Sequence, residues 1–216
     1  MSDQWWQNRP EKPIARMLLL HGAGAPADSE WMNVAAQALQ SLGLWVLRAE
    51  FDYMARRRVD GRKRPPPRAE KLLPELQARL TTLPGADDLP LFLAGKSMGG
   101  RLQTLLATGS RWPSALPAPA GVLALGYPFH PPGKQDRLRT DHFPDMITPL
   151  RIVQGSRDPM GPRALVDTLQ LPTAVSLHWE EDGNHDLRPR GLRKDEVWAH
   201  LAGTLRAQEP WLRAQL

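Results

Sequence analysis

Three residues that could perform acyl-transfer chemistry follow one another along this chain: a serine, an aspartate and a histidine. Ser97 stands in the motif Gly-Lys-Ser-Met-Gly of residues 95–99, between an apolar run and a helical pattern over 98–108. A serine on such a sharp strand-to-helix turn is strained and exposed, and many serine nucleophiles are presented in this way. Glycine is expected at both ends of the turn, because a side chain there would collide with the neighbouring strand or helix.

Asp158 and His185 could supply what a serine nucleophile needs. A serine hydroxyl is a poor nucleophile unless a base lies within hydrogen-bond reach. His185, in a glycine-flanked loop, could take that proton near neutral pH and return it to a leaving group. Asp158 could hold the imidazole in the required tautomer. Asp182 and Asp186 are alternatives for the acid, but as sequence neighbours of His185 they would have difficulty reaching its far nitrogen.

Two turns are expected to complete this site. The backbone N–H groups of Ala23 and Met98 are the candidate donors to the oxyanion that forms during acyl transfer. Gly22, Gly24 and Lys96, in the same two turns, are the candidate substrate-binding residues. His21, which precedes the first turn, is expected to shape that loop.

Other interpretations of these motifs were weighed. Residues 95–97 also end the phosphate-binding pattern Gly-x-x-x-x-Gly-Lys-Ser, but Pro90 stands where that pattern requires glycine, which argues against nucleotide binding. A serine between glycines can also be no more than a turn. No two histidines are spaced four apart on a predicted helix, so neither a metal nor a cofactor is expected.

The elements that must position these residues alternate between strands and helices. Apolar runs predict strands at 14–20, 44–49, 90–94, 121–125, 149–154 and 174–179, and helical spacing predicts helices near 28–42, 69–83, 98–108, 162–170 and 194–207. The alternation predicts a doubly wound α/β fold with a mostly parallel sheet of about six strands and helices on both faces. We expect residues 1–13 to be a polar segment and residues 14–216 to be one domain. Function in such folds collects at the carboxyl ends of the strands.

The composition of the chain argues against several classes of protein. The chain of 216 residues has no cysteine, which excludes disulfides and thiol catalysis. No stretch resembles an export signal or membrane span, so a cytoplasmic protein without a membrane partner is expected. The net charge of +5 could mean a polyanionic partner, but acidic residues are mixed in and no nucleic-acid motif is present, so an arginine-rich surface is favoured. The oligomeric state is left open.

The motifs at 21–25, 95–101, 126–133, 154–158 and 183–186 together resemble α/β-hydrolases. They are most similar to the small, lidless branch related to dienelactone hydrolases, which also includes a testis-expressed protein and a subunit of a chromatin acetyltransferase complex. The resemblance spans about residues 14–207 and implies a hydrolase without a cap domain. The nucleophile here is serine, not the cysteine of dienelactone hydrolases, so that activity is not carried over.

The sequence therefore predicts a serine hydrolase that cleaves an ester or thioester through an acyl-enzyme. The alternative is a non-catalytic binding or scaffold protein on the same fold. The proline-broken segment 126–149 is too short for a helical lid, which favours a shallow site and a small substrate. Basic residues in the loops after the strands either face solvent or face the site, and in the second case the acyl substrate would be anionic. They are residues 56–58, 62–64, 134, 137, 139, 157, 188 and 190.

Overall fold

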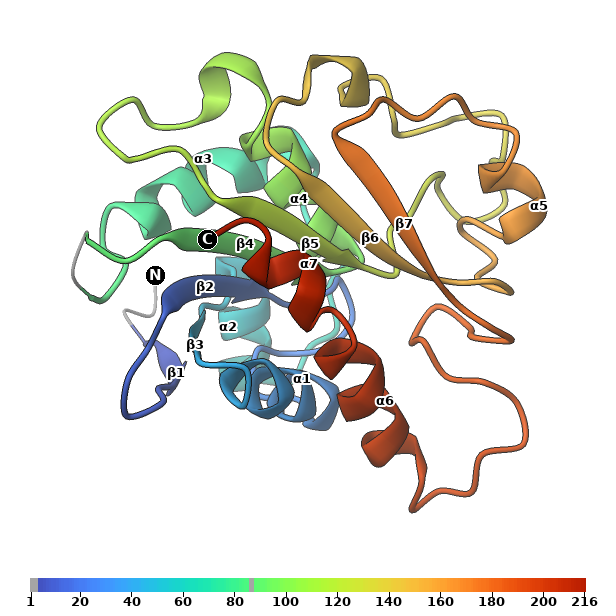
Figure 1. Ribbon diagram of the computed structural model, residues 1–216, viewed down its shortest axis with the longest axis horizontal. Coiled ribbons are helices and arrows are strands. Elements are labelled where there is room, and N and C mark those ends of the chain that lie inside the picture. Colours follow the sequence, from blue (N-terminus) through green and yellow to red (C-terminus); the bar gives the residue numbers. More distant parts are fainter. Residues whose placement is uncertain (1–3, 86–87) are drawn as a thin grey trace.

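The computed structural model describes residues 4–85 and 88–216, which fold around a seven-stranded sheet (Figure 1). The strand order is β1-β3-β2-β4-β5-β6-β7, and all neighbours are parallel except β1, which runs antiparallel to β3. The strands are β1 (Trp6–Asn8), β2 (Ala15–Leu20), β3 (Leu44–Arg48), β4 (Leu91–Lys96), β5 (Gly121–Leu125), β6 (Leu150–Gly155) and β7 (Val175–Glu180).

The central strands are mostly apolar because both of their faces are covered. Every residue of β2, β3 and β5 is buried, as expected for parallel strands between two helical layers. The register pairs Leu20 with Gly95, Lys96 with Leu125 and Gly155 with Glu180. The carboxyl ends of β2, β4, β5, β6 and β7 therefore meet along one edge of the sheet.

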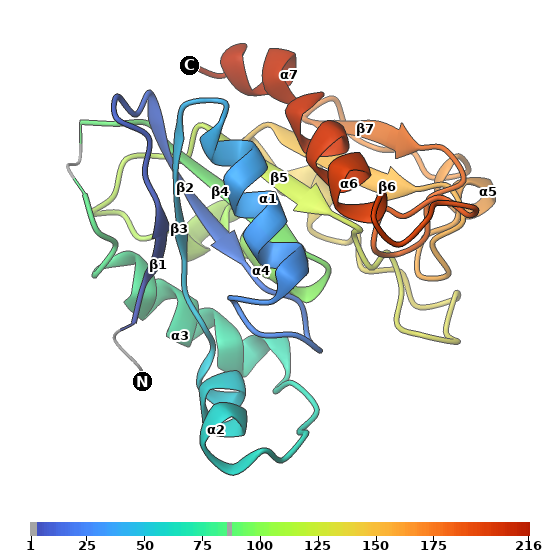
Figure 2. The same cartoon turned by 90° about the horizontal axis from the view of Figure 1, so that it is seen from below.

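Helices cover the two faces of the sheet (Figure 2). Buried side chains of α1, α6 and α7 form one apolar layer, and those of α2, α3 and α4 belong to the layer on the other face. In α3, Leu72, Leu76 and Leu80 recur every four residues and form its buried face, as the helical spacing predicts. The helices are α1 (Glu30–Gln40), α2 (Asp52–Asp60), α3 (Ala69–Leu80), α4 (Met98–Leu106), α5 (Arg163–Val166), α6 (Val197–Arg206) and α7 (Glu209–Arg213).

This architecture confirms the predicted doubly wound α/β fold. Between β5 and β6 the described residues form one short 3-10 turn, η2 (Phe143–Asp145), and no cap domain. A second such turn, η1 (Gly109–Arg111), follows α4. No helix in the described part of the chain has both the length and the apolarity needed to cross a bilayer.

Three elements were not predicted. β1 is a seventh strand in the amino-terminal segment; three residues are too short for a periodic pattern, and pairing with β3 defines it. α2 includes arginines that were expected to lie in a basic loop. The helix could not be predicted from spacing, because only its Tyr53 and Met54 are buried and its arginine-rich remainder has no apolar face. α7 follows α6 at the carboxyl end and buries Leu212. Two predicted helices are shorter than expected: α5 ends at Val166, and α6 starts at Val197.

Candidate active site

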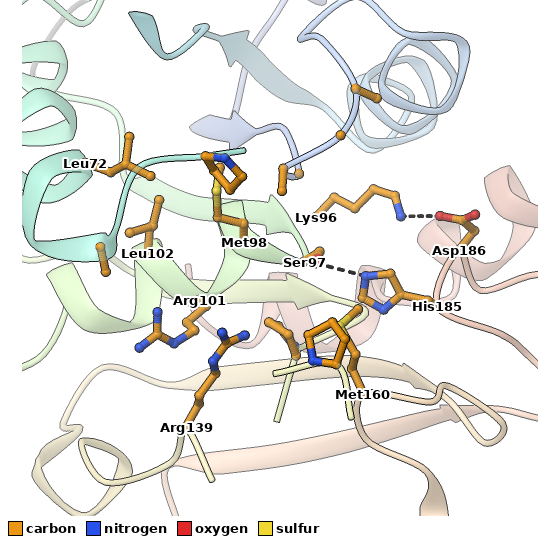
Figure 3. A pocket seen from close by; sticks show the side chains of 18 of the residues that line it. Leu72, Lys96, Ser97, Met98, Arg101, Leu102, Arg139, Met160, His185 and Asp186 are labelled. Carbon is orange, nitrogen blue, oxygen red and sulfur yellow. Dashed lines mark hydrogen bonds and ion pairs between the residues drawn. The ribbon is translucent and has the colours of Figure 1, made fainter. Parts of the chain in front are cut away.

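Ser97 lies on the turn between β4 and α4 in a strained backbone conformation, with φ of 50° and ψ of −114°. Its N–H donates to the carbonyl oxygen of Leu125 at 2.8 Å, and its own carbonyl accepts from the N–H of Arg101 at 3.0 Å. The strand on one side and the helix on the other therefore fix the turn. Its hydroxyl opens into a cavity at the carboxyl edge of the sheet (Figure 3).

The two glycines of this turn are needed for packing, as the sequence predicted. A Cβ on Gly95 would lie 2.4 Å from backbone atoms of Gly99 and Gly100, which belong to α4. A Cβ on Gly99 would lie 2.7 Å from the carbonyl oxygens of Leu20 and His21, at the end of β2. Backbone atoms cannot give way as a flexible side chain can, so any larger residue would move the serine.

Ser97, His185 and Asp158 converge, as predicted from their places at three strand ends. His185 Nε2 lies 2.9 Å from Ser97 Oγ, and His185 Nδ1 lies 2.7 Å from Asp158 Oδ2. The Asp158 carboxylate is fully buried. The two alternatives for the acid have other partners: Asp182 pairs with arginines, and Asp186 pairs with Lys96.

Hydrogen bonds from neighbouring residues hold the Asp158 carboxylate in place beside His185. Its Oδ1 accepts from the N–H of Met160 at 2.9 Å, and its Oδ2 accepts from Gln154 Nε2 at 2.9 Å. Gln154 is held in turn, because its Oε1 accepts from the N–H of Tyr127 at 2.7 Å. A carboxylate that accepts from His185 Nδ1 leaves Nε2 as the ring nitrogen that faces Ser97 Oγ, which is the arrangement that a general base requires.

Gln154 was missed from the sequence. It is a fully buried polar residue at the end of a strand, four residues before Asp158. A glutamine near the end of a mostly apolar strand is the signal that could have found it, because a buried amide needs partners.

Glycines at the ends of two further strands make room for the His185 loop. A Cβ on Gly126, after β5, would lie 2.6 Å from the carbonyl oxygen of His185. A Cβ on Gly155, the last residue of β6, would lie 2.3 Å from the carbonyl oxygen of Asn184. The histidine is therefore positioned by direct backbone packing against the sheet.

The first glycine-rich turn is held by side chains. Buried His21 accepts the N–H of Phe51 at Nε2, at 3.2 Å, and its Nδ1 lies 2.7 Å from the carbonyl oxygen of Gly22. Burial lowers the pKa of His21 and keeps the ring neutral. Tyr53 Oη donates to the carbonyl oxygen of Ala23 at 3.1 Å. His21 thus shapes this loop, as expected from its position.

All five remaining predicted residues line the cavity of about 730 Å³ at Ser97; they are Gly22, Ala23, Gly24, Lys96 and Met98. Met98 is the first residue of α4, so its N–H has no partner within the helix. Lys96 forms an ion pair with Asp186 (Figure 3). Its ammonium also lies over the Trp31 ring, 5.0 Å from the ring centroid. Burial alone would raise the pKa of Asp186, but the Lys96 charge holds it below its usual value.

Most of the predicted basic loop residues do not line this cavity. Arg139 does, together with Arg68 and Arg101, which were not singled out. Several others form ion pairs on the surface: Arg58 with Asp28 and Glu50, Arg64 with Asp60, and Arg157 and Arg190 with Asp182. Within residues 4–85 and 88–216, no three histidine, aspartate or glutamate side chains are grouped as a metal site would require.

Comparison with known protein families identifies the family to which this fold belongs. The family model described as "Alpha/beta hydrolase domain" matches residues 13–211. The chain therefore belongs to this alpha/beta hydrolase family.

Solved structures share the fold at low sequence identity. An alpha-beta serine hydrolase homologue from Coxiella burnetii is 19% identical, with a TM-score of 0.69, and the match covers 94% of this chain and 90% of that one. A dienelactone hydrolase from Anabaena variabilis is 20% identical, with a TM-score of 0.69 over 97% and 90%. Est1E from Butyrivibrio proteoclasticus, solved with ferulic acid bound, is 15% identical, with a TM-score of 0.69 over 98% and 94%.

Proposed function

We propose that this chain is a serine hydrolase that cleaves an ester or thioester of a small acyl group. The observation that carries the proposal is the continuous hydrogen-bonded chain from Ser97 through His185 to buried Asp158, with spacings of 2.9 and 2.7 Å, at the wall of an open cavity. A nucleophile, a base and an acid that orients the base are the parts that acyl transfer requires.

The reaction proceeds in two halves. Ser97 Oγ attacks the carbonyl carbon while His185 Nε2 takes the hydroxyl proton, and the carbonyl oxygen becomes an oxyanion. Collapse breaks the bond to the alcohol or thiol, which leaves with the proton from His185. Water then attacks the acyl-enzyme by the same route, with His185 as base, and releases the acid. Asp158 stabilises the imidazolium in both halves.

The oxyanion is bound by the backbone N–H groups of Ala23 and Met98. Because backbone packing holds one turn and hydrogen bonds hold the other, these donors need little reorganisation as charge develops, and each is worth about 10²–10³ in rate. Gly22 and Gly24 present the first turn to the substrate without side chains. Lys96 closes one side of the cavity through its ion pair with Asp186.

The relatives support the same reaction class. The Coxiella burnetii protein is described as a serine hydrolase homologue, and the Butyrivibrio proteoclasticus protein was solved with ferulic acid, a carboxylic acid of the kind that ester cleavage releases. We propose that this chain acts on a small molecule in the cytoplasm and needs no cofactor.

A panel of para-nitrophenyl esters and acyl-thioesters with acyl chains of increasing length tests the proposal. The wild-type chain is expected to cleave short acyl groups fastest, and Ser97→Ala is expected to lose at least about 10³-fold in kcat. Ser29→Ala is the matched control, because Ser29 lines the same cavity but its hydroxyl has no hydrogen-bond partner among the described residues. Turnover that survives Ser97→Ala, or no turnover on any substrate, would favour the binding or scaffold protein.

A further inference from the structure

Three arginines line the Ser97 cavity, and two of them, Arg101 and Arg139, lie side by side. Arg101 and Arg139 both line this cavity, and each side chain is partly buried. Arg101 Nε is buried without a hydrogen-bond acceptor. Among the described residues no carboxylate forms an ion pair with either guanidinium, whereas Arg58, Arg64, Arg157 and Arg190 are all paired.

The two guanidinium groups lie beside one another (Figure 3). Burial and then the positive charge of Arg101 hold the pKa of Arg139 below its usual value. Burial, with the charges of Arg101 and Arg111, also lowers the pKa of His142 to about 4. Like charges brought together away from water cost free energy, so this part of the cavity is prepared for an anion.

The backbone holds both arginines in place. Arg101 stands one turn after Ser97 in α4 and donates its N–H to the Ser97 carbonyl at 3.0 Å. The backbone of Arg139 is anchored on both sides: its N–H donates to the carbonyl of Phe129 at 2.7 Å, and its carbonyl accepts from Tyr127 Oη at 2.7 Å. His142, three residues further on, is bonded to Thr104 of α4 at 2.8 Å. The loop is thereby attached to the helix that carries Arg101.

The position of Arg101 and Arg139 in the cavity places them on the side where the acyl half of the substrate is expected. In Figure 3, Arg101 and Arg139 lie on the Met98 side of Ser97, and His185 lies on the opposite side. The leaving group must face His185, which gives it a proton, so the acyl group extends toward the arginines. One helical turn separates Arg101 from Ser97, about 6 Å along the axis, so the anionic group stands several bonds from the scissile carbonyl.

We propose that Arg101 and Arg139 form an anion-binding subsite that selects acyl groups ending in a carboxylate or a phosphate. A guanidinium presents a planar fork of N–H donors that matches the oxygens of either anion, and two such forks can bind one group. This inference rests on the proposed function, and it names the acyl chain that the hydrolase accepts. The substrate class is a half-ester or half-thioester of a dicarboxylic acid, or its phosphorylated counterpart.

The test compares para-nitrophenyl hydrogen adipate with para-nitrophenyl adipamate, in which a neutral carboxamide replaces the carboxylate. Wild-type kcat/KM is expected to favour the anionic ester by at least about tenfold, because hydrogen bonds to charged groups are the stronger ones. Arg101→Gln and Arg139→Gln should each lower that ratio by at least about tenfold. Arg137→Gln, an exposed arginine on the same loop, is the control and should keep the wild-type ratio.

Two further measurements separate this proposal from the proposed function. The wild-type ratio should fall as salt is raised, which requires no variant to fold. Adipate should bind Ser97→Ala in a calorimetric titration and lose that binding when Arg101→Gln is added, which requires no turnover. Hydrolysis of both esters at equal rates, without adipate binding, would overturn the subsite and leave the hydrolase intact. Adipate binding without any hydrolysis would support the subsite and remove the proposed function.

Discussion

The turn after β2 and the turn after β4 are both rich in glycine, and both line the cavity at Ser97. Different interactions hold them. In the turn after β4, backbone packs against backbone: a Cβ on Gly95 or Gly99 would lie within 2.7 Å of main-chain atoms. In the turn after β2, a Cβ on Gly24 would meet nothing within 4 Å, and one on Gly22 would make an ordinary contact at 3.5 Å.

In the turn after β2, hydrogen bonds made by side chains take the place of backbone packing. His21 bonds to Phe51, Tyr53 bonds to the Ala23 carbonyl, and Arg57 Nη1 donates to the Gly24 carbonyl at 2.8 Å. The comparison shows that glycine content alone does not reveal which turn depends on glycine. It also divides the proposed oxyanion site into a half fixed by main chain and a half fixed by titratable and polar side chains.

The largest effect is expected for Gly99→Ala. The new Cβ would press on the carbonyl oxygens of Leu20 and His21, so the free energy of unfolding should fall by about 2–3 kcal/mol or more. Activity should fall at least about 10²-fold, because Ser97 must move. Gly203→Ala is the control: in α6 a Cβ there meets nothing within 4 Å, and the change should be neutral or stabilising. Urea unfolding measures the free energy of unfolding of both variants, and equal values would contradict the claim that the turn after β4 depends on glycine.

A pH-dependent effect is expected for His21, and only in the first turn. Its folded pKa is below the usual value of 6.5, so its contribution to stability is complete above about pH 6.5 and is lost as pH falls through the folded pKa. His21→Gln should therefore lose about 1–3 kcal/mol at pH 8, and this deficit relative to wild type should shrink toward pH 5. Denaturation series at several pH values measure the deficit, and a deficit that does not change with pH contradicts the account.

A smaller effect is expected for Tyr53→Phe, which removes the 3.1 Å hydrogen bond to the Ala23 carbonyl. The free energy of unfolding should fall by about 1 kcal/mol. The kcat for a neutral ester should fall up to about tenfold, because the Ala23 N–H is less firmly placed. Steady-state kinetics beside urea unfolding would show both changes. Unchanged kcat with lowered stability would mean that the first turn does not hold an oxyanion donor.

The smallest effect is expected for Gly24→Ala. The position has open space, and its φ lies outside the left-handed region, so the free energy of unfolding should change by less than about 0.5 kcal/mol. Thermal unfolding of this variant beside Gly99→Ala would sharpen the contrast. A large loss at Gly24 would show that the two turns depend on glycine in the same way.

The site also shows how much of the structure could be predicted from the sequence. Ser97, Asp158 and His185 could be found because each ends or follows a strand, and the topology brings those ends to one edge. Gln154 carries a weaker signal, a buried amide near the end of a strand and four residues before Asp158. The Arg101–Arg139 pair carries none, since its significance depends on residues that are distant in sequence and on an anionic partner that is missing. Among the arginines, composition gives the charge but not the pairing, so one predicted loop contributes Arg139 to the cavity while others are neutralised at the surface.

Covalent labelling by a fluorophosphonate tests the central claim most directly, because the reagent reacts with an activated serine and does not depend on the natural substrate. Intact-mass analysis should show a single adduct on the wild-type chain, and peptide mapping should place it on Ser97. The adduct should be absent in Ser97→Ala and present in Ser29→Ala, whose serine lines the same cavity. No adduct on the wild-type chain, or an adduct that survives Ser97→Ala, would contradict the assignment of Ser97 as a nucleophile.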